Sequence, residues 1–222
     1  MRIRHLDARQ GYDLWSETYD ATPNPVVSLD ERVTPAVVQA ERGERILDAG
    51  CGTGRYFSEF LKANSEVVGL DFSFGMLEIA HRNYRNIRLV LADLQRPWPF
   101  RDGIFDAVVC ALVGEHLEQL PLVLGEMQRV LHREGRVVFS VYHPEMAAAG
   151  IEANFQKDRI EYRLGAIRHT SGDYTQAFQQ AGFVDISVRE FSGDEQLAES
   201  VPEARKYLGF PLLLLLQARN AT

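Results

Sequence analysis

The stretch ILDAGCGTG, residues 46–54, decides the fold class of this 222-residue chain. A short apolar run ends in an aspartate and is followed by three glycines at alternate positions, Gly50, Gly52 and Gly54. Glycines so placed let the chain turn sharply and let a ligand lie against bare backbone. A helix that begins near Gly54 would offer free N–H groups to that ligand. The stretch predicts a strand, a ligand-binding turn and a helix, with a purely structural turn as the alternative.

The spacing of the glycines narrows the class of ligand. The dinucleotide fingerprint G-x-G-x-x-G, begun at Gly50, needs its third glycine where the chain has Arg55. Begun at Gly52, it needs that glycine where the chain has Phe57. The phosphate-binding pattern G-x-x-x-x-G-K-[ST] is absent from the sequence. The turn therefore favours a ligand without a pyrophosphate, and a nicotinamide-dependent oxidoreductase stays open as an alternative.

Apolar runs alternate with helical patterns along the first two thirds of the chain. The runs are rich in Val, Ile and Leu and lie at 45–50, 66–71, 87–93, 105–112 and 135–142. Such runs predict strands buried on both faces of a parallel sheet. Strand–helix–strand repetition predicts right-handed crossovers between them. The sequence thus predicts a doubly wound α/β sheet in a single domain over residues 1–222.

Residues 143–172 fit neither pattern. They combine Pro144, Gly150, Gly165 and Gly172 with aromatic and charged residues. We expect an insertion after the fifth strand that lies over the carboxyl ends of the strands and carries substrate specificity. Its mixture of aromatic and basic residues suits an aromatic or carboxylated substrate, unless the charges simply form a solvated face.

Two aspartates end the second and third predicted strands. Asp71 closes EVVGLD, where a carboxylate can accept hydrogen bonds from both hydroxyls of a ribose. Asp93 closes IRLVLAD, where it can accept from an exocyclic amine while Leu94 offers its backbone N–H to a ring nitrogen. A solvated turn residue and a helix cap are the structural alternatives. Because parallel strands end at one edge, both aspartates and the glycine turn are expected to line one crevice.

In order and spacing, ILDAGCGTG, VVGLDFSFGML, LADLQRPWPF and FDAVVCALVGEHL resemble the motifs of class I S-adenosylmethionine-dependent methyltransferases. The resemblance covers about residues 45–142, and PLLLLLQARN is similar to that family's closing strand. It implies a Rossmann-like sheet of seven strands in the order 3-2-1-4-5-7-6, with the last strand antiparallel and helices on both faces. It also implies S-adenosylmethionine as cofactor, S-adenosylhomocysteine as product, and transfer of the methyl group to an O or N atom of a small molecule.

The resemblance further implies which residues hold the cofactor. The three aromatic residues of GYDLWSETYD would lie on a helix of an N-terminal lid, residues 1–40, with plain hydrophobic packing as the alternative. Asp48 and Gly50 would lie near the methionine end, and Ala111 and Leu112 near the sulfonium. The full implied cofactor set is Tyr12, Trp15, Tyr19, Asp48, Gly50, Cys51, Gly52, Gly54, Asp71, Phe72, Met76, Asp93, Leu94, Ala111 and Leu112.

Methyl transfer from a sulfonium depends mostly on placing the nucleophile and excluding water. Oriented proximity of the reacting groups can lower the barrier by on the order of 7–11 kcal/mol. A general base helps only where the acceptor must lose a proton. His143, at the end of the fifth strand, is the preferred candidate, beside His116 after the fourth strand and His169 ahead of a later helix. Histidines titrate near neutral pH, which suits that role. Hydrogen-bonded structural histidines are the alternative.

Bulk properties limit the partners. The net charge of −7 argues against nucleic-acid binding, which rests on Lys and Arg. Cys51 and Cys110 show no disulfide or metal spacing and indicate reduced thiols. No signal peptide is evident, and the longest apolar run, 211–216, is far shorter than the roughly 20 residues that span a bilayer. We expect a cytoplasmic monomer or homodimer without metal, membrane or nucleic-acid partner.

A lyase, cyclase or regulatory binder on the same fold is the alternative function.

Overall fold

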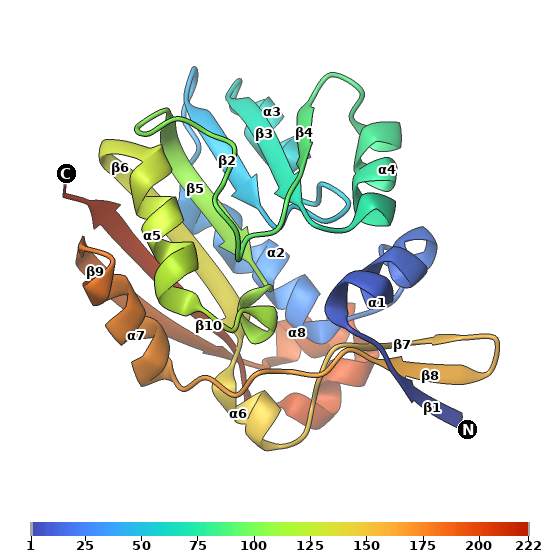
Figure 1. Cartoon of the computed structure of the whole chain (residues 1–222). Coiled ribbons are helices and arrows are strands. Elements are labelled where there is room, and N and C mark those ends of the chain that lie inside the picture. The colour runs from blue at the N-terminus through green and yellow to red at the C-terminus, as the bar shows by residue number, and fades with distance from the viewer. Residues whose placement is uncertain (1, 222) are drawn as a thin grey trace.

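The centre of the molecule is a twisted sheet of seven strands (Figure 1). The structure is a computed structural model that describes residues 2–221, so both ends of the predicted 1–222 domain lie outside it. The sheet has the order β4-β3-β2-β5-β6-β10-β9. Its strands are β2 (Arg45–Ala49), β3 (Glu66–Asp71), β4 (Arg88–Leu91), β5 (Phe105–Ala111), β6 (Leu131–Tyr142), β9 (Phe183–Ser192) and β10 (Pro211–Asn220).

Numbered by appearance within this sheet, the order reads 3-2-1-4-5-7-6. β10 runs antiparallel to both of its neighbours, β6 and β9. The other neighbouring pairs, from β4 through β6, are parallel. The predicted fold class is therefore confirmed, including the antiparallel closing strand.

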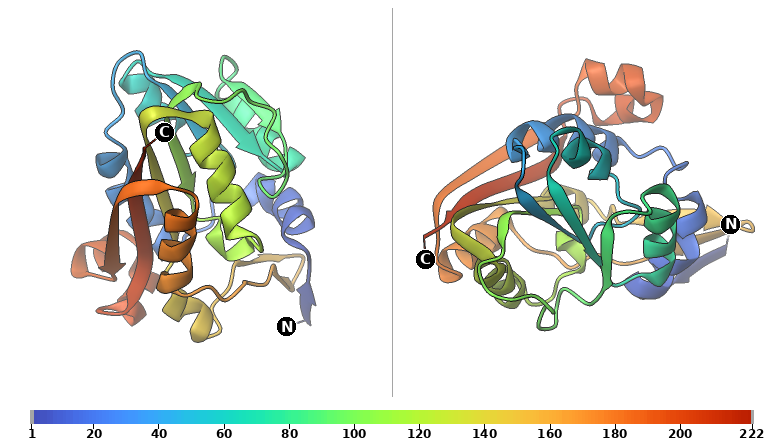
Figure 2. Two further views of the ribbon diagram at one scale, coloured as in Figure 1. Left: turned by 60° about the vertical axis from the view of Figure 1, so that its left-hand side comes forward. Right: turned by 90° about the horizontal axis from the view of Figure 1, so that it is seen from above.

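Helices cover both faces of the sheet, as the two views of Figure 2 show. The α-helices are α1 (Ala8–Trp15), α2 (Pro25–Val38), α3 (Phe57–Lys62), α4 (Phe74–Asn83), α5 (Leu120–Val130), α6 (Pro144–Ala148), α7 (Ser171–Gln180) and α8 (Glu195–Ser200). Three 3₁₀ helices are η1 (Ser16–Thr18), η2 (Gly114–His116) and η3 (Pro202–Tyr207). Within residues 2–221, every helix is too short or too polar to cross a bilayer.

The two-sided burial of the strands explains their unbroken apolar runs. Alternate residues of a strand point to opposite faces. In β2, Leu47 joins the core under α5 and α7, while its neighbour Ile46 joins the core under α2, α3 and α4. Both side chains are fully buried, which accounts for the apolar residues at these two positions.

A second, smaller sheet lies beside α1. It consists of β1 (Arg2–His5), β8 (Ile160–Arg163) and β7 (Asn154–Lys157), in that order. β7 and β8 form an antiparallel hairpin within the predicted insertion, and β1 pairs parallel to β8. The N-terminal segment, expected to be a helical lid, thus begins with a strand before α1, because its backbone finds pairing partners in the insertion.

The glycine turn delays the start of the helix that follows it. Gly52 and Gly54 have φ values of +53° and +85°, in the left-handed region that an α-helix cannot use. The chain continues as turns closed by bonds from Gly54 N to Cys51 O (2.9 Å) and from Phe57 N to Gly54 O (3.0 Å). α3 therefore begins at Phe57 rather than near Gly54.

Candidate active site

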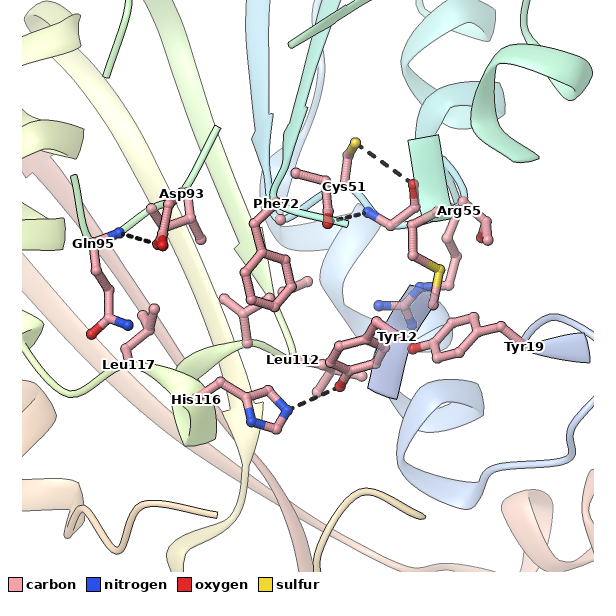
Figure 3. A pocket seen from close by; sticks show the side chains of 18 residues that line it. Tyr12, Tyr19, Cys51, Arg55, Phe72, Asp93, Gln95, Leu112, His116 and Leu117 are labelled. Atoms are coloured by element: carbon pink, nitrogen blue, oxygen red, sulfur yellow. Dashed lines mark hydrogen bonds between the residues drawn. The ribbon is translucent and has the colours of Figure 1, made fainter. Parts of the chain in front are cut away.

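A pocket opens at the carboxyl ends of β2, β3, β4 and β5, beneath α1 (Figure 3). It encloses about 760 Å³ of space not filled by protein atoms, including its open mouth. The carboxyl edge of a parallel sheet is where open α/β folds bind ligands. The crevice predicted from the glycine turn and the two aspartates is present.

Asp71 forms the centre of the pocket floor. Its carboxylate is 6% exposed and accepts hydrogen bonds from Gly52 N (2.9 Å, to Oδ2) and Ser73 N (2.8 Å, to Oδ1). Each oxygen keeps a further lone pair for a ligand. Burial raises the pKa of Asp71 to about 6. The carboxylate thus fixes the glycine turn and still offers two acceptors at the pocket surface.

The glycine turn supplies a wall without side chains. Gly50 has a φ of +83°, and a Cβ atom added there would lie 2.6 Å from Cγ1 of Val113, another pocket residue. A side chain at this position would occupy the space where β2 and β5 end. The bare backbone therefore leaves a cradle that a flat or extended ligand can enter.

Asp48 lies behind that wall. It is 2% exposed, and its Oδ2 atom has no hydrogen-bond partner among residues 2–221. Burial raises the pKa of Asp48 to about 7. Its carboxyl does not line the pocket, so any contact with a ligand would need a bridging water or a shift of the turn.

The opposite end of the pocket combines a flat ring with polar atoms. Asp93 accepts from Gln95 N (3.0 Å) and from Nη2 of Arg9 (3.3 Å), and its side chain is 31% exposed. Leu94 is buried beside it, and the Phe72 ring faces the pocket. This arrangement suits a planar heterocycle with exocyclic donors.

Tyr12 and His116 meet at the pocket roof, as Figure 3 shows. The Tyr12 hydroxyl and Nε2 of His116 are joined by a 3.0 Å hydrogen bond. Burial lowers the pKa of His116 to about 4 and raises that of Tyr12 well above its ordinary value. Both groups are therefore neutral at pH 7. One hydrogen lies between the Tyr12 oxygen and Nε2 of His116 in this bond.

Asp13 anchors α1 over the pocket. Its Oδ1 atom accepts from Oγ of Ser73 (2.6 Å) and from Gly75 N (3.0 Å) at the start of α4. A second tie runs from Oγ1 of Thr53, in the glycine turn, to Oδ1 of Asp20 (2.7 Å). The segment that covers the pocket is thus hydrogen-bonded to its rim through Asp13 and Asp20, in addition to the bonds of Arg9 and Tyr12 described above.

We expect Asp13→Ala to loosen α1 by about 1.5–3 kcal/mol, because it removes two hydrogen bonds to a charged acceptor. Hydrogen exchange of the α1 amides should accelerate accordingly. Glu17→Ala is the matched control, since it removes only an exposed ion pair with Arg82 between the same parts of the chain. Unchanged exchange in Asp13→Ala, or equal acceleration in both variants, would show that Asp13 is no anchor.

The chain is similar to known methyltransferases over most of its length. The family model of the methyltransferase domain matches residues 47–139. A demethylmenaquinone methyltransferase of Streptomyces avermitilis is 29% identical over 199 residues, which cover 87% of this chain and 83% of that protein. The chain belongs to the class I S-adenosylmethionine-dependent methyltransferases.

Two further comparisons are with a relative and, for the fold alone, with a solved structure. A malonyl-[acyl-carrier protein] O-methyltransferase of Halorhodospira halophila is 32% identical over 190 residues, 80% of this chain and 61% of that protein. The crystal structure of an S-adenosylmethionine-dependent methyltransferase from Mesorhizobium loti has a TM-score of 0.72 at 24% identity, covering 87% of this chain and 99% of that one. The predicted family, fold and enzyme class of this methyltransferase are confirmed.

Most residues predicted to hold the methyltransferase's cofactor line the pocket. These are Tyr12, Tyr19, Gly50, Cys51, Gly52, Asp71, Phe72, Met76, Asp93, Leu94, Ala111 and Leu112. Asp48, Trp15 and Gly54 do not line it. Gly54 instead borders a hollow on the outer side of the turn, because the chain has already passed the end of β2.

Trp15 was expected at the cofactor and lies elsewhere. Its ring stacks on Phe155 of the insertion at a centroid distance of 4.9 Å, and its Nε1 donates to Oγ1 of Thr22 (3.3 Å). On α1, Trp15 points away from the pocket toward the hairpin, where burial of two aromatic rings stabilises the contact. For Trp15 the alternative of hydrophobic packing is the better description.

The three candidate histidines are separated by the fold. His143 is 4% exposed and caps α6, with Nδ1 accepting from Glu145 N (3.3 Å) and Nε2 3.5 Å from Oε1 of Glu190. This helix-capping geometry keeps it out of the crevice into which it was expected to open. His169 donates from Nε2 to the carbonyl of Leu117 (2.7 Å), behind η2. Among the three, His116 lines the pocket.

The structure adds pocket residues that the sequence interpretation missed: Thr53, Arg55, Gln95, Val113 and Leu117. Arg55 is the most informative. Its Nη2 lies 2.9 Å from Oδ2 of Asp30, a fully buried carboxylate, and its Nη1 donates to Val27 O (3.3 Å). An arginine directly after a ligand-binding turn is a sequence signal for an anionic group on the ligand. The sequence interpretation used Arg55 only as evidence against a dinucleotide, because a glycine is needed at that position.

Proposed function

We propose that this methyltransferase binds S-adenosylmethionine in the pocket and transfers its methyl group to an oxygen or nitrogen atom of a small molecule. The observation that carries the proposal is the buried Asp71 carboxylate, which is held by the glycine turn and keeps two free lone pairs at the pocket surface. A ribose diol presents two donors at the spacing of one carboxylate.

The other pocket residues fit the remaining parts of the cofactor. Leu94 and Asp93 would hold the adenine, with Phe72 and Met76 against its faces. The Gly50 cradle and Arg55 would receive the methionine end, where the guanidinium meets a carboxylate. Bound there, the cofactor would supply a methyl group attached to a positively charged sulfur. The sulfur leaves as a neutral thioether, which makes it a good leaving group.

The chain's own contribution is positioning and exclusion of water. Tyr12 and Tyr19 cover the pocket, and Ala111 and Leu112 form the small apolar surface beside the proposed position of the methyl group. Oriented proximity alone supplies on the order of 7–11 kcal/mol. The neutral His116, bonded to Tyr12, is positioned to hold the acceptor by a hydrogen bond, but burial that lowers its pKa to about 4 makes it a weak base.

The names of the relatives support a small-molecule acceptor without fixing it. One group is named for demethylmenaquinone and another for malonyl-[acyl-carrier protein]. We propose that the N-terminal helices act as a lid and that residues 143–172 form the substrate side, because the hairpin of this insertion packs against α1 beside the pocket.

Transfer of isotopically labelled methyl tests the proposal. The protein, incubated with methyl-labelled S-adenosylmethionine and a library of small hydroxyl and amino compounds, should place the label in one compound class. Binding of the cofactor without label in any product would favour a lyase, cyclase or regulatory binder on the same fold.

The affinity for S-adenosylhomocysteine should fall as pH drops through about 6. Burial raises the pKa of Asp71 to about 6, so the carboxylate gains a proton below that value and loses an acceptor for the ribose. At one pH unit below this pKa, the affinity for S-adenosylhomocysteine should be about tenfold lower. Calorimetric titration between pH 5 and pH 8 measures it. Asp71→Asn, which has no proton to gain, should give a flat profile; an equally steep profile in that variant would assign the titration to another group.

A further inference from the structure

The Arg55 side chain lies between two spaces. It lines the cofactor pocket and also a hollow between the segment after η1, the start of α2, the glycine turn and the end of α4. This outer hollow encloses about 1000 Å³, including its open mouth, and two carboxyl groups, those of Asp20 and Glu31, line it. A cationic side chain that borders both spaces needs a contact that decides its direction.

The local backbone does not provide that contact. Gly54 has a φ of +85°, and α3 begins at Phe57, so Arg55 lies on a turn ahead of the first regular helical residue. Arginine has a long side chain that loses much rotamer freedom when it is fixed in one direction. Groups from another element must therefore hold the guanidinium.

Asp30 of α2 is such a group. Its carboxylate is fully buried, and Oδ2 lies 2.9 Å from Nη2 of Arg55. The same carboxylate accepts from Oγ1 of Thr34 (2.5 Å, to Oδ1) and from the Tyr56 hydroxyl (to Oδ2). The Tyr56 ring also lies against the guanidinium, with Cζ of Arg55 4.8 Å from the ring centroid. Because both oxygens of Asp30 are held, the carboxylate determines where the guanidinium lies.

The helix that carries Asp30 is itself fixed at both ends. Asn24 caps its first turn by accepting from Val26 N (2.9 Å), and the carbonyl of Val38 in its last turn accepts from Nε of Arg136 on β6 (2.7 Å). Leu29 is fully buried in the apolar core around the start of β10. The position of Asp30 therefore follows from the packing of α2 on the central sheet.

Arg55 keeps donors for a ligand. A guanidinium has five N–H donors. In the described part of the chain, its polar contacts are the ion pair with Asp30 and one hydrogen bond from Nη1 to Val27 O (3.3 Å). The side chain is 16% exposed where it borders the two spaces. The remaining donors suit a carboxylate, since a planar guanidinium matches two oxygens at once.

We propose that Asp30 is a positioning residue for the carboxylate of the cofactor: by fixing Arg55, it directs the guanidinium to the cofactor pocket and away from the carboxyl groups of the outer hollow. The proposal rests on the proposed function, in which Arg55 receives the methionine end. Among the described residues, Asp30 does not line the pocket, so it acts through Arg55. It should therefore control recognition of the carboxylate and leave recognition of the adenosine unchanged.

Two ligands that differ by one carboxylate test this role: S-adenosylhomocysteine and its decarboxylated analogue, which keeps the adenosine, the thioether and the amine. Calorimetric titration gives the ratio of the two affinities for each protein. The wild type should favour S-adenosylhomocysteine by about tenfold or more, which is the usual value of hydrogen bonds to a charged group. Asp30→Ala should bring the ratio close to one without changing the affinity for the analogue.

Leu29→Ala is the matched control on the same helix. It leaves a cavity in the apolar core and destabilises the protein without touching the ion pair, so it should keep the wild-type ratio. An unchanged ratio in Asp30→Ala would overturn the role of Asp30. Tighter binding of S-adenosylhomocysteine by that variant would do so as well, because it would mean that Asp30 only weakens the charge of Arg55.

The double variant Asp30→Ala/Arg55→Met keeps the test available where Asp30→Ala alone does not fold, since neither charge of the pair stays buried without its partner. If Asp30 acts through Arg55, the double variant should bind S-adenosylhomocysteine as Arg55→Met does. A further loss of affinity in the double variant would contradict the proposal.

The wild-type protein separates this proposal from the proposed function. Failure to bind either ligand would refute the proposed function itself. Equal affinity for both ligands would leave the cofactor pocket in place and refute recognition of the carboxylate through Arg55 and Asp30.

Discussion

Asp71→Ala is expected to weaken S-adenosylhomocysteine binding by about 1–3 kcal/mol, or roughly 5- to 150-fold. The substitution removes a buried charged acceptor that we assign to both ribose hydroxyls. It also removes the bonds to Gly52 N and Ser73 N that fix the glycine turn. Calorimetric titration measures the loss directly.

Two variants separate these contributions. Glu66→Ala, at the exposed opposite end of β3, should leave the affinity unchanged, because that side chain pairs only with Arg45 outside the pocket. Asp71→Asn keeps the shape and one acceptor oxygen and should lie between the wild type and Asp71→Ala. Wild-type affinity in Asp71→Ala would show that the ribose assignment is wrong.

Arg55→Met is expected to lower the free energy of unfolding by about 3–5 kcal/mol, the usual cost of breaking a buried ion pair from one side. Asp30 is fully buried, and its carboxylate pairs with Arg55 while accepting from Oγ1 of Thr34 (2.5 Å) and from the Tyr56 hydroxyl. Without the guanidinium, a carboxylate stays buried without its countercharge.

Urea unfolding of Arg55→Met against the wild type gives the change in free energy. The control is Arg45→Met, which removes an exposed ion pair with Glu66 and should cost about 0–1 kcal/mol. Equal effects of the two substitutions would mean that the Asp30–Arg55 pair is not the stabilising contact that its burial indicates.

The sheet and the pocket floor were predictable because backbone geometry determines them. A strand buried on both faces needs an unbroken apolar run, so the runs of β2, β3 and β5 also locate their carboxyl ends. Asp71 ends such a run, and its place at the pocket followed without knowledge of any side-chain contact. The role of Gly50 was predictable for the same reason. A positive φ and the close approach of another residue, here Val113, both require glycine.

The misplaced residues depend on tertiary contacts that no local pattern reports. Trp15 and Tyr12 lie on the same helix, yet one packs on Phe155 and the other enters the pocket. His143 follows a strand that ends at the crevice, but the turn into α6 makes it a helix cap. Its side-chain direction depends on that turn, which the sequence did not predict.

Arg55 and Glu115 were missed for a different reason. Both are charged residues in segments where the sequence analysis considered only the glycines and the histidines as functional candidates. Their significance comes from burial: Arg55 beside Asp30, and Glu115 with two oxygens that have no hydrogen-bond partner within residues 2–221. Burial of a charged side chain is decided by the packing of distant elements, here α2 for Arg55 and the 143–172 insertion for Glu115.

A crystal structure of the protein with S-adenosylhomocysteine tests the central claim most directly. We predict both ribose hydroxyls within hydrogen-bond distance of the Asp71 carboxylate, the adenine beside Asp93 and Leu94, and the sulfur next to Ala111 and Leu112. A ligand bound outside this pocket, or one whose ribose makes no contact with Asp71, would contradict the account.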